Sequence, residues 1–460
     1  MSVNPPTLHK GITTLNRELF KLNKIIGALI VPSSACREAM TTLKGEGILN
    51  IPRAPSIIPA PPTIENFKQK RLLLLNPDVN HDNLDALPTP LKLFATRVGA
   101  TITTHTLNLD YNYWSTEQIL RAVLPNELDI IGSFATIGHI AHLNLRDGYE
   151  PYKKLIGQVI LDKSKHIETV VNKTDTIDHT FRFFSMELLA GKDDTIAQLK
   201  ESGCRFKFDF AKVYWNSRLQ TEHQRLVDTF KKGDIIFDVF AGVGPFAIPA
   251  AKHSQCFVFA NDLNPSSFEY LNDNIHLNRV GDRVASFNLD GRSFIKQSLE
   301  LLIVKDTWDK FGTTKKELIR TLRSSDTIDT ESELPIDMEN LKINHFIMNL
   351  PATGLEFLGT HPKLKLNIDS FIGLYEDKKD IIKPEQLPII HCHCFSKAEN
   401  VVEDVITRTE TILDTKLGDH LITVHNVRNV APRKEMMCIS FRLPADVAFR
   451  TNLKRKAIPE

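Results

Sequence analysis

Two glycines and a carboxylate have the spacing of a nucleoside-binding site. Gly242 and Gly244 directly follow a short apolar run, and Asp262 comes twenty residues after Gly242, at the end of a second apolar run. Glycine lets the backbone approach a ligand closely, and a carboxylate at this distance can bind both hydroxyls of a ribose. Pro245 and Phe246 stand where a dinucleotide-binding turn needs its third glycine. The motif therefore predicts a nucleoside ligand without phosphates, and an ordinary strand–turn–helix unit is the alternative.

Two more motifs end predicted strands later in the chain. Asp290 precedes Gly291, and Asn349-Leu350-Pro351 follows the run 345–348. Ligands of a doubly wound sheet bind at the carboxyl ends of its strands. The four motifs have the cofactor order of a Rossmann-like methyltransferase: the glycines meet the amino-acid part, Asp262 the ribose and Asp290 the adenine amine. Asn349 and Pro351 would then offer a backbone carbonyl and an amide to a target base. Taken alone, both later motifs also suit turns.

The elements that must position these motifs form an α/β pattern. Residues 216–445 are predicted as a doubly wound, mostly parallel domain with an antiparallel edge. Its expected parallel strands lie at 235–237, 256–260, 284–289, 345–348 and 388–395, and its edge pair at 422–430 and 436–443. A polar stretch near 305–340 is expected to be a surface insertion, and 446–460 a basic tail.

Smaller α/β or α+β domains are expected before this domain. Residues 1–70 form an extension with a helix near Thr13–Leu29 and a proline-rich arm at 52–62. Residues 71–114, with part of that extension, form a small N-terminal domain. The predicted middle domain spans 115–215, and its expected helices and strands follow. The helices lie at 115–124 and 156–161, and the strands at 129–135, 140–145, 169–171 and 207–210.

The net charge of the whole chain does not indicate a class of binding partner, but the charge of its N-terminal part does. The 460-residue chain has a net charge of +1, but residues 1–115 hold twelve Lys or Arg against eight Asp or Glu, which suits an anionic partner or a solvated basic face. Six scattered cysteines indicate a reducing compartment. The apolar run Ile25 to Val31 is too short to span a bilayer. Basic and hydroxyl residues before Glu18 give a weak mitochondrial-presequence signal.

Several segments together resemble one enzyme family. They are GVGPFAIP (242–249), NSRLQTEHQRL (216–226), Asn349-Leu350-Pro351 and VHNVRNVAPRKEMMCISFRLP (424–444). They are similar to the archaeal and eukaryotic tRNA (guanine-N1)-methyltransferases, which methylate guanine 37 beside the anticodon. The resemblance covers about residues 115–445. It implies an S-adenosyl-L-methionine (AdoMet) donor, a tRNA substrate bound by the N-terminal domains, and three domains.

The resemblance also implies roles for individual residues. Glu222 would be the general base and Arg182 would stabilise charge on guanine O6, because methylation at N1 must release a proton and relieve charge on O6. Arg218 could instead pair with Glu222 at helical spacing. His223 stands where the family often has arginine. Catalytic roles would also fall to Asn349 and Pro351. The expected cofactor-binding residues are Tyr214, Arg218, His223, Asp238, Gly242, Gly244, Pro245, Phe246, Asn261, Asp262, Leu263, Asp290, Gly291 and Asn349.

The run His391-Cys392-His393-Cys394 could suggest a metal site. In a strand its histidines share one face and its cysteines the other, which suits tetrahedral ligation poorly, so no metal is expected. Met436-Met437-Cys438 is expected to be strand core.

The resemblance implies a monomer, without DNA or membrane partners, in cytoplasm, nucleus and mitochondrial matrix. Its activity would support reading-frame maintenance and supply the precursor of wyosine-type bases. Three rivals remain: a wyosine-pathway aminocarboxypropyltransferase, an amino-methylating enzyme with an Asn-Pro-Pro-aromatic motif, and a non-catalytic RNA-binding protein. Ala352 in place of the aromatic argues against the second, and the intact Glu222 and glycine turn argue against the third.

Overall fold

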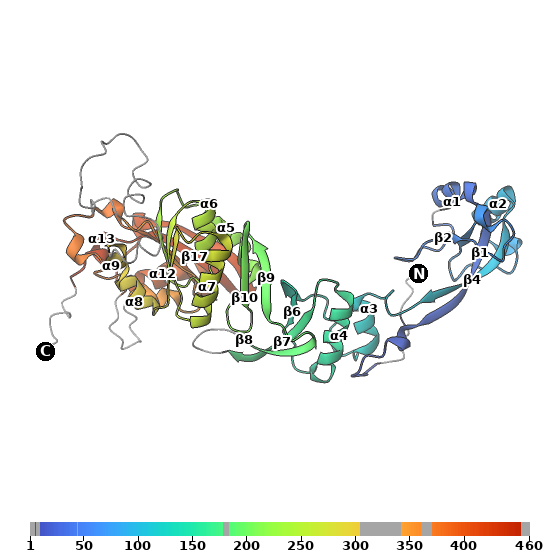
Figure 1. The fold of residues 1–460 in the computed structure, drawn as a ribbon, viewed down its shortest axis with the longest axis horizontal. Coiled ribbons are helices and arrows are strands. Elements are labelled where there is room, and N and C mark those ends of the chain that lie inside the picture. The colour runs from blue at the N-terminus through green and yellow to red at the C-terminus, as the bar shows by residue number, and fades with distance from the viewer. Residues whose placement is uncertain are drawn as a thin grey trace. The chain divides into compact units, whose positions relative to one another are not determined.

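The chain divides into two compact units (Figure 1). The computed structural model describes residue 5 and residues 10–43, 45–177, 184–303, 342–359 and 370–451. The first unit comprises Met1–Lys173 and Glu187–Asp193, and the second comprises Thr174–Met186 and Asp194–Glu460. Arg182, the expected insertion at 305–340 and most of the expected tail lie outside the described residues. Among the described helices, none combines the length and apolar composition needed to cross a lipid bilayer.

An antiparallel sheet of four strands begins the first unit. Its order is β2 (Ile57–Pro59), β3 (Lys70–Leu74), β1 (Leu22–Pro32) and β4 (Thr101–Leu109), accompanied by α1 (Cys36–Thr42) and α2 (Thr89–Val98). The helix expected near Thr13–Leu29 is wrong. The run is rich in β-branched residues and contains Gly27, which together favour a strand over a helix. The expected boundary at residue 70 lies inside this sheet, and the proline-rich arm supplies β2.

A second sheet lies largely in the first unit, and the ends of two of its strands, 174–177 and 184–186, belong to the second. Its strands are β5 (Ala135–Ile137), β6 (Ile140–Leu143), β7 (Thr169–Ile177) and β8 (Phe184–Gly191), in that order, with helices α3 (Thr116–Val123) and α4 (Lys153–Lys163). Ser115 and Gln118 form a capping box that starts α3 as expected. The strand expected at 129–135 is wrong, since only Ala135 is in a strand. Trp114 is fully buried and donates its indole N–H to the carbonyl of Phe20, 2.8 Å away.

The second unit opens with a hairpin and a short helix and continues as an α/β domain. After the hairpin, helices and strands alternate as far as β13, and the bounds of the described helices and strands from the hairpin onward come next. They are β9 (Ile196–Glu201), β10 (Cys204–Asp209), α5 (Gln220–Val227), β11 (Ile235–Asp238), α6 (Ala247–His253), β12 (Phe257–Asn261), α7 (Pro265–Asn278), β13 (Val284–Phe287), α8 (Gly291–Lys296), α9 (Ser298–Ile303), β14 (His345–Met348), β15 (Ile389–Ser396), α12 (Val401–Leu413), β16 (Leu421–Ala431), β17 (Lys434–Arg442) and α13 (Ala445–Ala448).

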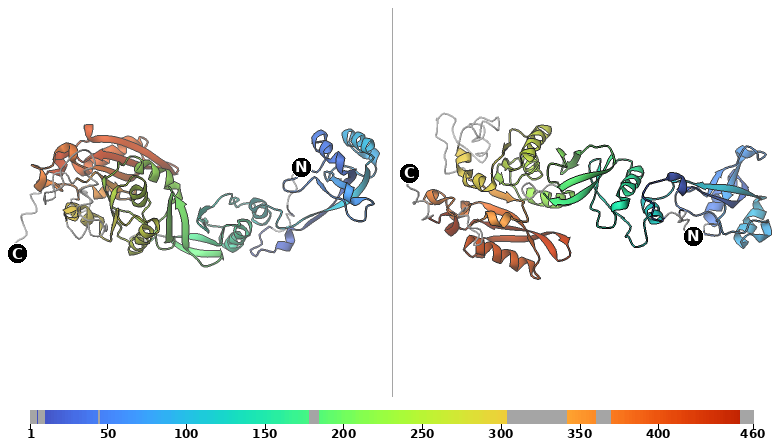
Figure 2. Two further views of the ribbon diagram at one scale, coloured as in Figure 1. Left: turned by 45° about the horizontal axis from the view of Figure 1, so that its top comes forward. Right: turned by 90° about the horizontal axis from the view of Figure 1, so that it is seen from below.

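The seven-stranded sheet of this domain has the order β13-β12-β11-β14-β15-β17-β16. Its first five strands pair in parallel, and β17 pairs antiparallel to both β15 and β16. Figure 2 shows β16 and β17, in red, as one side of the sheet. The predicted doubly wound domain with an antiparallel edge is confirmed. Because β11 and β14 are neighbours, the chain reverses direction across the sheet between them, which is where such folds bind ligands.

The two faces of this sheet differ in polarity. One face buries the main hydrophobic core, with Phe237 stacked on Phe259 at a ring distance of 4.5 Å, and Cys392 and Cys394 belong to this core. The other face carries His391 and His393, which are buried and hydrogen-bonded. The predicted alternation of histidines and cysteines along β15 is therefore confirmed.

Candidate active site

The glycine turn after β11 leaves room for a ligand at one of its two glycines. Gly242 and Gly244 both have positive φ, 54° and 98°. A Cβ on Gly244 would lie 2.7 Å from Ile248 Cδ1, so Gly244 is needed for packing, whereas a Cβ on Gly242 would meet nothing within 4 Å. The space beside Gly242 is therefore open to a bound molecule.

Asp262 connects this turn to the end of β12. Its Oδ2 accepts a hydrogen bond from the backbone N–H of Gly242 at 2.8 Å, and its Oδ1 accepts one from Asn264 at 2.9 Å. Each carboxylate oxygen keeps lone pairs for a further donor, such as a ribose hydroxyl. Leu263, the next residue, is 46% exposed and extends the same edge.

Asn261 holds strand ends together. Its fully buried side chain donates to the carbonyls of Val239 and Leu289, at 3.1 and 3.0 Å, and accepts from the N–H of Leu289 at 2.8 Å. Because these backbone groups already occupy its amide, Asn261 would affect a cofactor indirectly, by aligning the strand ends that contact it.

Three side chains have buried polar atoms without hydrogen-bond partners among the described residues: Asp238 at the end of β11, Asn349 just after β14, and His393 within β15. The atoms are both carboxylate oxygens of Asp238, Oδ1 of Asn349 and Nδ1 of His393. Burial, with a further contribution from the charge of Asp262, raises the pKa of Asp238 to about 8. Buried polar atoms are nearly always bonded to protein, water or ligand. These atoms therefore mark where a polar ligand fits.

Asp290 and Gly291 have structural roles of their own. Asp290 is exposed and caps α8, because its Oδ1 accepts from the backbone N–H groups of Arg292 and Ser293 at 2.9 and 3.3 Å. A Cβ on Gly291 would lie 2.8 Å from the ring of Phe240. Asp290 therefore acts as a helix cap rather than in a turn, and its adenine contact stays a prediction.

Two backbone carbonyls of the segment after β14 accept hydrogen bonds within the domain. The carbonyl of Pro351 accepts from Phe395 N–H at 3.0 Å, and that of Leu350 accepts from Gly354 N–H at 2.6 Å. The expected carbonyl at Pro351 is therefore already bonded within the domain. The side-chain oxygen of Asn349 remains for a target base.

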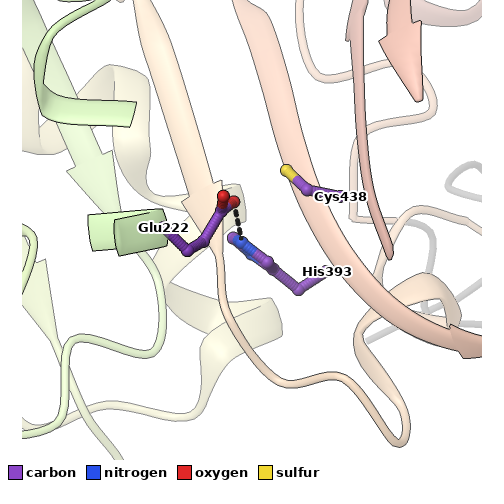
Figure 3. A group of neighbouring side chains, drawn as sticks. All are labelled: Glu222, His393 and Cys438. Carbon is purple, nitrogen blue, oxygen red and sulfur yellow. Dashed lines mark hydrogen bonds and ion pairs between the residues drawn. The ribbon is translucent and has the colours of Figure 1, made fainter. Parts of the chain in front are cut away.

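Glu222 lies on α5 and reaches the sheet (Figure 3). Its side chain is 2% exposed, and its carboxylate pairs with Arg225 at 2.6 and 2.7 Å and with Nε2 of His393 at 2.7 Å. Burial alone would raise the pKa of Glu222, but hydrogen bonds from Arg225 and His393 hold it well below its usual value. The alternative pairing with Arg218 is wrong, because Arg225, three residues later, takes that place.

The remaining expected residues divide into exposed and buried ones. Tyr214 is 49% exposed, and Arg218 is exposed as well. His223 is buried and its Nδ1 lies 2.5 Å from Glu201 Oε1, while the buried ring of Phe246 contacts the ring of His223 edge-on. Pro245 is half-buried in the turn.

Three residues beside Glu222 were missed from the sequence. Arg225 was available from its helical spacing to Glu222. For His393 the sequence predicts the face of β15 but no partner. For Cys438 it predicts strand core, whereas Cys438 is paired in register with His393 and lies on the polar face. Single ligand atoms of Glu222, His393 and Cys438 all lie within 4.8 Å of one another.

Known proteins match this chain over almost its whole length. The relative from Batrachochytrium dendrobatidis, a tRNA (guanine(37)-N(1))-methyltransferase, is 51% identical, and the match covers 96% of this chain and 91% of that protein. The enzyme of the same name from Candida albicans (strain SC5314) is 40% identical over 98% of this chain and 99% of its own. The chain belongs to the tRNA (guanine(37)-N(1))-methyltransferase family.

Family models and solved structures agree with this membership. Residues 197–328 match the TRM5/TYW2 methyltransferase domain and residues 116–195 match the TYW2 N-terminal domain. The structure of aTrm5 in complex with tRNALeu is 21% identical, with a TM-score of 0.57, and the match covers 90% of this chain and 99% of that one. Wild-type Trm5b from Pyrococcus abyssi is 22% identical, with a TM-score of 0.53 and coverage of 91% and 99%. These two likenesses show the shared methyltransferase fold.

Proposed function

We propose that this protein transfers a methyl group from AdoMet to N1 of guanine 37 in tRNA. The observation that carries the proposal is the identity of 51% over 96% of the chain to an enzyme named for this reaction. Side chains at the strand ends and Glu222 on α5 support the proposal.

The residues of the glycine turn fit the amino-acid and ribose parts of AdoMet. The open side of Gly242 admits a ligand against the backbone, and Asp262 keeps lone pairs for ribose hydroxyls. The unpartnered oxygens of Asp238 suit a cationic or hydroxyl donor group. When bound, AdoMet supplies the methyl group and leaves as a thioether.

Glu222 is the proposed acceptor of the guanine N1 proton. Its low pKa keeps it ionised at neutral pH, and it can take the proton because N1 becomes far more acidic as the methyl group bonds to it. Asn349 would hold the flipped base through its side-chain amide, and Arg182, outside the described residues, would stabilise charge on O6.

A wyosine-type aminocarboxypropyltransferase is the second candidate, because the matching family models carry the names of both enzymes. Curated relatives from Batrachochytrium dendrobatidis, Candida albicans and Danio rerio, at 51%, 40% and 39% identity, favour methyl transfer, since each is named for it. The two reactions break different bonds of the same AdoMet sulfonium, so product analysis separates them.

The tRNA partner is proposed from the same family, with the basic N-terminal region holding the tRNA body through its phosphates. We further propose a monomer without DNA or membrane partners, and distribution among cytoplasm, nucleus and mitochondrial matrix. The function would support reading-frame maintenance and wyosine synthesis.

The test is transfer of labelled methyl from AdoMet to full-length tRNA transcripts that carry guanine or adenine at position 37. We expect 1-methylguanine with guanine 37 and no product with adenine 37. Label transferred from the aminocarboxypropyl chain instead would establish the second candidate. AdoMet binding without transfer of either label would contradict both.

A further inference from the structure

The polar face of the sheet brings one row of three side chains beneath α5. His393 on β15 is the register partner of Cys438 on β17, and Cys438 is the register partner of His425 on β16. Glu222 reaches this row from α5, and Figure 3 shows its carboxylate directed at His393. The two residues are 171 positions apart in the chain.

The two oxygens of Glu222 are not equivalent. Oε1 accepts from Nε2 of His393 and from Nη2 of Arg225, both at 2.7 Å, whereas the one donor to Oε2 among the described residues is Nε of Arg225, at 2.6 Å. His425 Nε2 lies 3.7 Å from Oε2, which is too far for a hydrogen bond. Oε1 is therefore saturated, and Oε2 retains a lone pair.

We propose that His393 is a positioning residue that anchors Glu222 through Oε1, so that Oε2 is the oxygen that receives the guanine N1 proton. The inference rests on the proposed role of Glu222 as base. In this step the N1–H bond breaks, an Oε2–H bond forms, and the electron pair of the N1–H bond stays on nitrogen. His393 itself neither gains nor loses a proton.

The positions of Arg225 and His393 explain why Glu222 needs a second anchor. Arg225 is three residues away on the same helix and moves with Glu222, so it fixes the carboxylate only relative to α5. His393 is 0% exposed and belongs to the central part of the sheet. A hydrogen bond from a rigid strand fixes the carboxylate relative to the strand ends where Asn349 and the glycine turn lie.

Charge in this cluster gives the proposal a measurable signature. The groups that face Glu222 are Arg225 on α5, His393 on β15 and His425 on β16. Cys438 on β17 lies beside His393. The carboxyl of Asp238 is near enough to His393 to interact with it by charge. Burial disfavours a charged His393, but Cys438 and Glu222 outweigh burial and raise its pKa. Loss of this cation would raise the pKa of Glu222 and move the acidic limb of the rate profile to higher pH.

A bound cation is the competing explanation for a Glu, a His and a Cys at this distance. Arg225 already compensates the charge of Glu222 with two hydrogen bonds, so a cation would have to displace a guanidinium. The structure therefore favours a hydrogen-bonded anchor over a metal site.

The experiment compares single-turnover methyl transfer from about pH 5.5 to about pH 9 for the wild type and for His393→Gln and His393→Leu. Gln keeps a neutral N–H donor that can reach Oε1, and Leu keeps none. We expect rates lowered about 10-fold for Gln and about 100-fold or more for Leu, with AdoMet affinity within about 2-fold of wild type. Because the pKa of Glu222 lies well below this range, its titration should not limit the wild-type rate there, whereas an acidic limb should enter the low end of the range in both variants.

His391→Gln is the matched control. His391 is buried on the same face of the same strand, but it bonds to His345 and Ser440 at 3.0 and 2.8 Å rather than to Glu222. We expect its rate and its acidic limb to match the wild type. Equal loss in His391→Gln and His393→Gln would mean that His393 is merely structural and would overturn the proposal.

Two further outcomes separate the proposal from its premise. If Glu222→Gln keeps the wild-type rate, the assignment of the base itself fails. If Glu222→Gln is impaired while a folded His393→Leu keeps its rate and its acidic limb, only the role of His393 is wrong. A stoichiometric metal in the purified protein that is lost in His393→Gln would also overturn the anchor in favour of a metal site.

Discussion

Asp262 and Gly242 are joined by a hydrogen bond of 2.8 Å between a carboxylate oxygen and a backbone N–H. The bond links the end of β12 to the turn after β11, so the residue expected to bind ribose also shapes the turn that faces the rest of the cofactor. Loss of the Asp262 carboxylate should therefore weaken AdoMet binding in two ways, by removing the ribose contact and by loosening the turn.

We expect Asp262→Ala to weaken AdoMet binding by about 100-fold, since it removes a charged acceptor and loosens the glycine turn. Isothermal titration calorimetry measures the change. Asp282→Ala, at an exposed carboxylate, is the control and should bind normally. Unchanged affinity in Asp262→Ala would remove this residue from the site.

The two glycines of the turn should respond differently to alanine. At Gly244 the new Cβ would clash with Ile248 at 2.7 Å, so we expect a marked loss of stability. At Gly242 the space is open but φ is 54°, so Gly242→Ala should lose only about 1–2 kcal/mol of folding free energy, the cost of a left-handed backbone, and should bind AdoMet more weakly. Chemical denaturation and calorimetry together test this. Normal AdoMet affinity in Gly242→Ala would show that the open side is not used.

Asp238 should couple AdoMet binding to proton release. Its pKa of about 8 means that it is mostly protonated at pH 7 in the free protein. If the cofactor binds the ionised carboxylate, binding at pH 7 releases close to one proton, and affinity rises with pH until about pH 8. Calorimetry in phosphate and in Tris buffers detects the proton as a difference in apparent enthalpy. The difference should vanish in Asp238→Asn, and identical enthalpies for the wild type would refute the coupling.

Glu222→Ala and Arg182→Ala should slow single-turnover methyl transfer by about 100-fold or more while AdoMet affinity stays near normal. The reason is that neither side chain is assigned to the cofactor: one takes the N1 proton and the other stabilises O6. Rapid-quench assays with saturating tRNA provide the measurement. A variant that keeps near wild-type chemistry would lose its assigned role.

Arg225→Leu should destabilise the fold by about 3 kcal/mol, because it leaves the buried Glu222 without its strongest partner. In the double variant with Glu222→Gln much of that loss should disappear, since no buried charge then remains. Urea denaturation gives both values. Arg121→Leu removes an exposed ion pair with Glu117 and should leave stability almost unchanged. Simple additivity of the two buried substitutions would argue against the pairing.

The parallel strands of the α/β domain were predictable because each is a short apolar run that ends in a turn residue or a polar side chain, as at Asp238 and Asp290. The N-terminal sheet was harder. The apolar residues of Leu22–Pro32 fit a helix as well as a strand. Its β-branched residues and Gly27 favour the strand, and pairing with β3 and β4 stabilises it. In the same way, Ile57–Pro59 is a strand only because β3 lies beside it.

The candidate site shows the same limit. The strand-end motifs were available because each is local, and so was the alternation that places His391 and His393 on one face. The partnership of Glu222 with His393 depends on α5 docking against a strand 171 residues later. No local pattern reports such a contact, since it arises only from tertiary packing.

That long separation has a consequence for how activity is acquired. The glycine turn and Asp262 lie within a few dozen residues and can form early, whereas the carboxylate of Glu222 gains its anchor only after β15 has joined the sheet. A partly folded or truncated chain could therefore capture AdoMet without possessing an oriented base. Such a form would bind AdoMet without transferring its methyl group. Methyl transfer would therefore show that the domain has folded completely, whereas AdoMet binding alone would not.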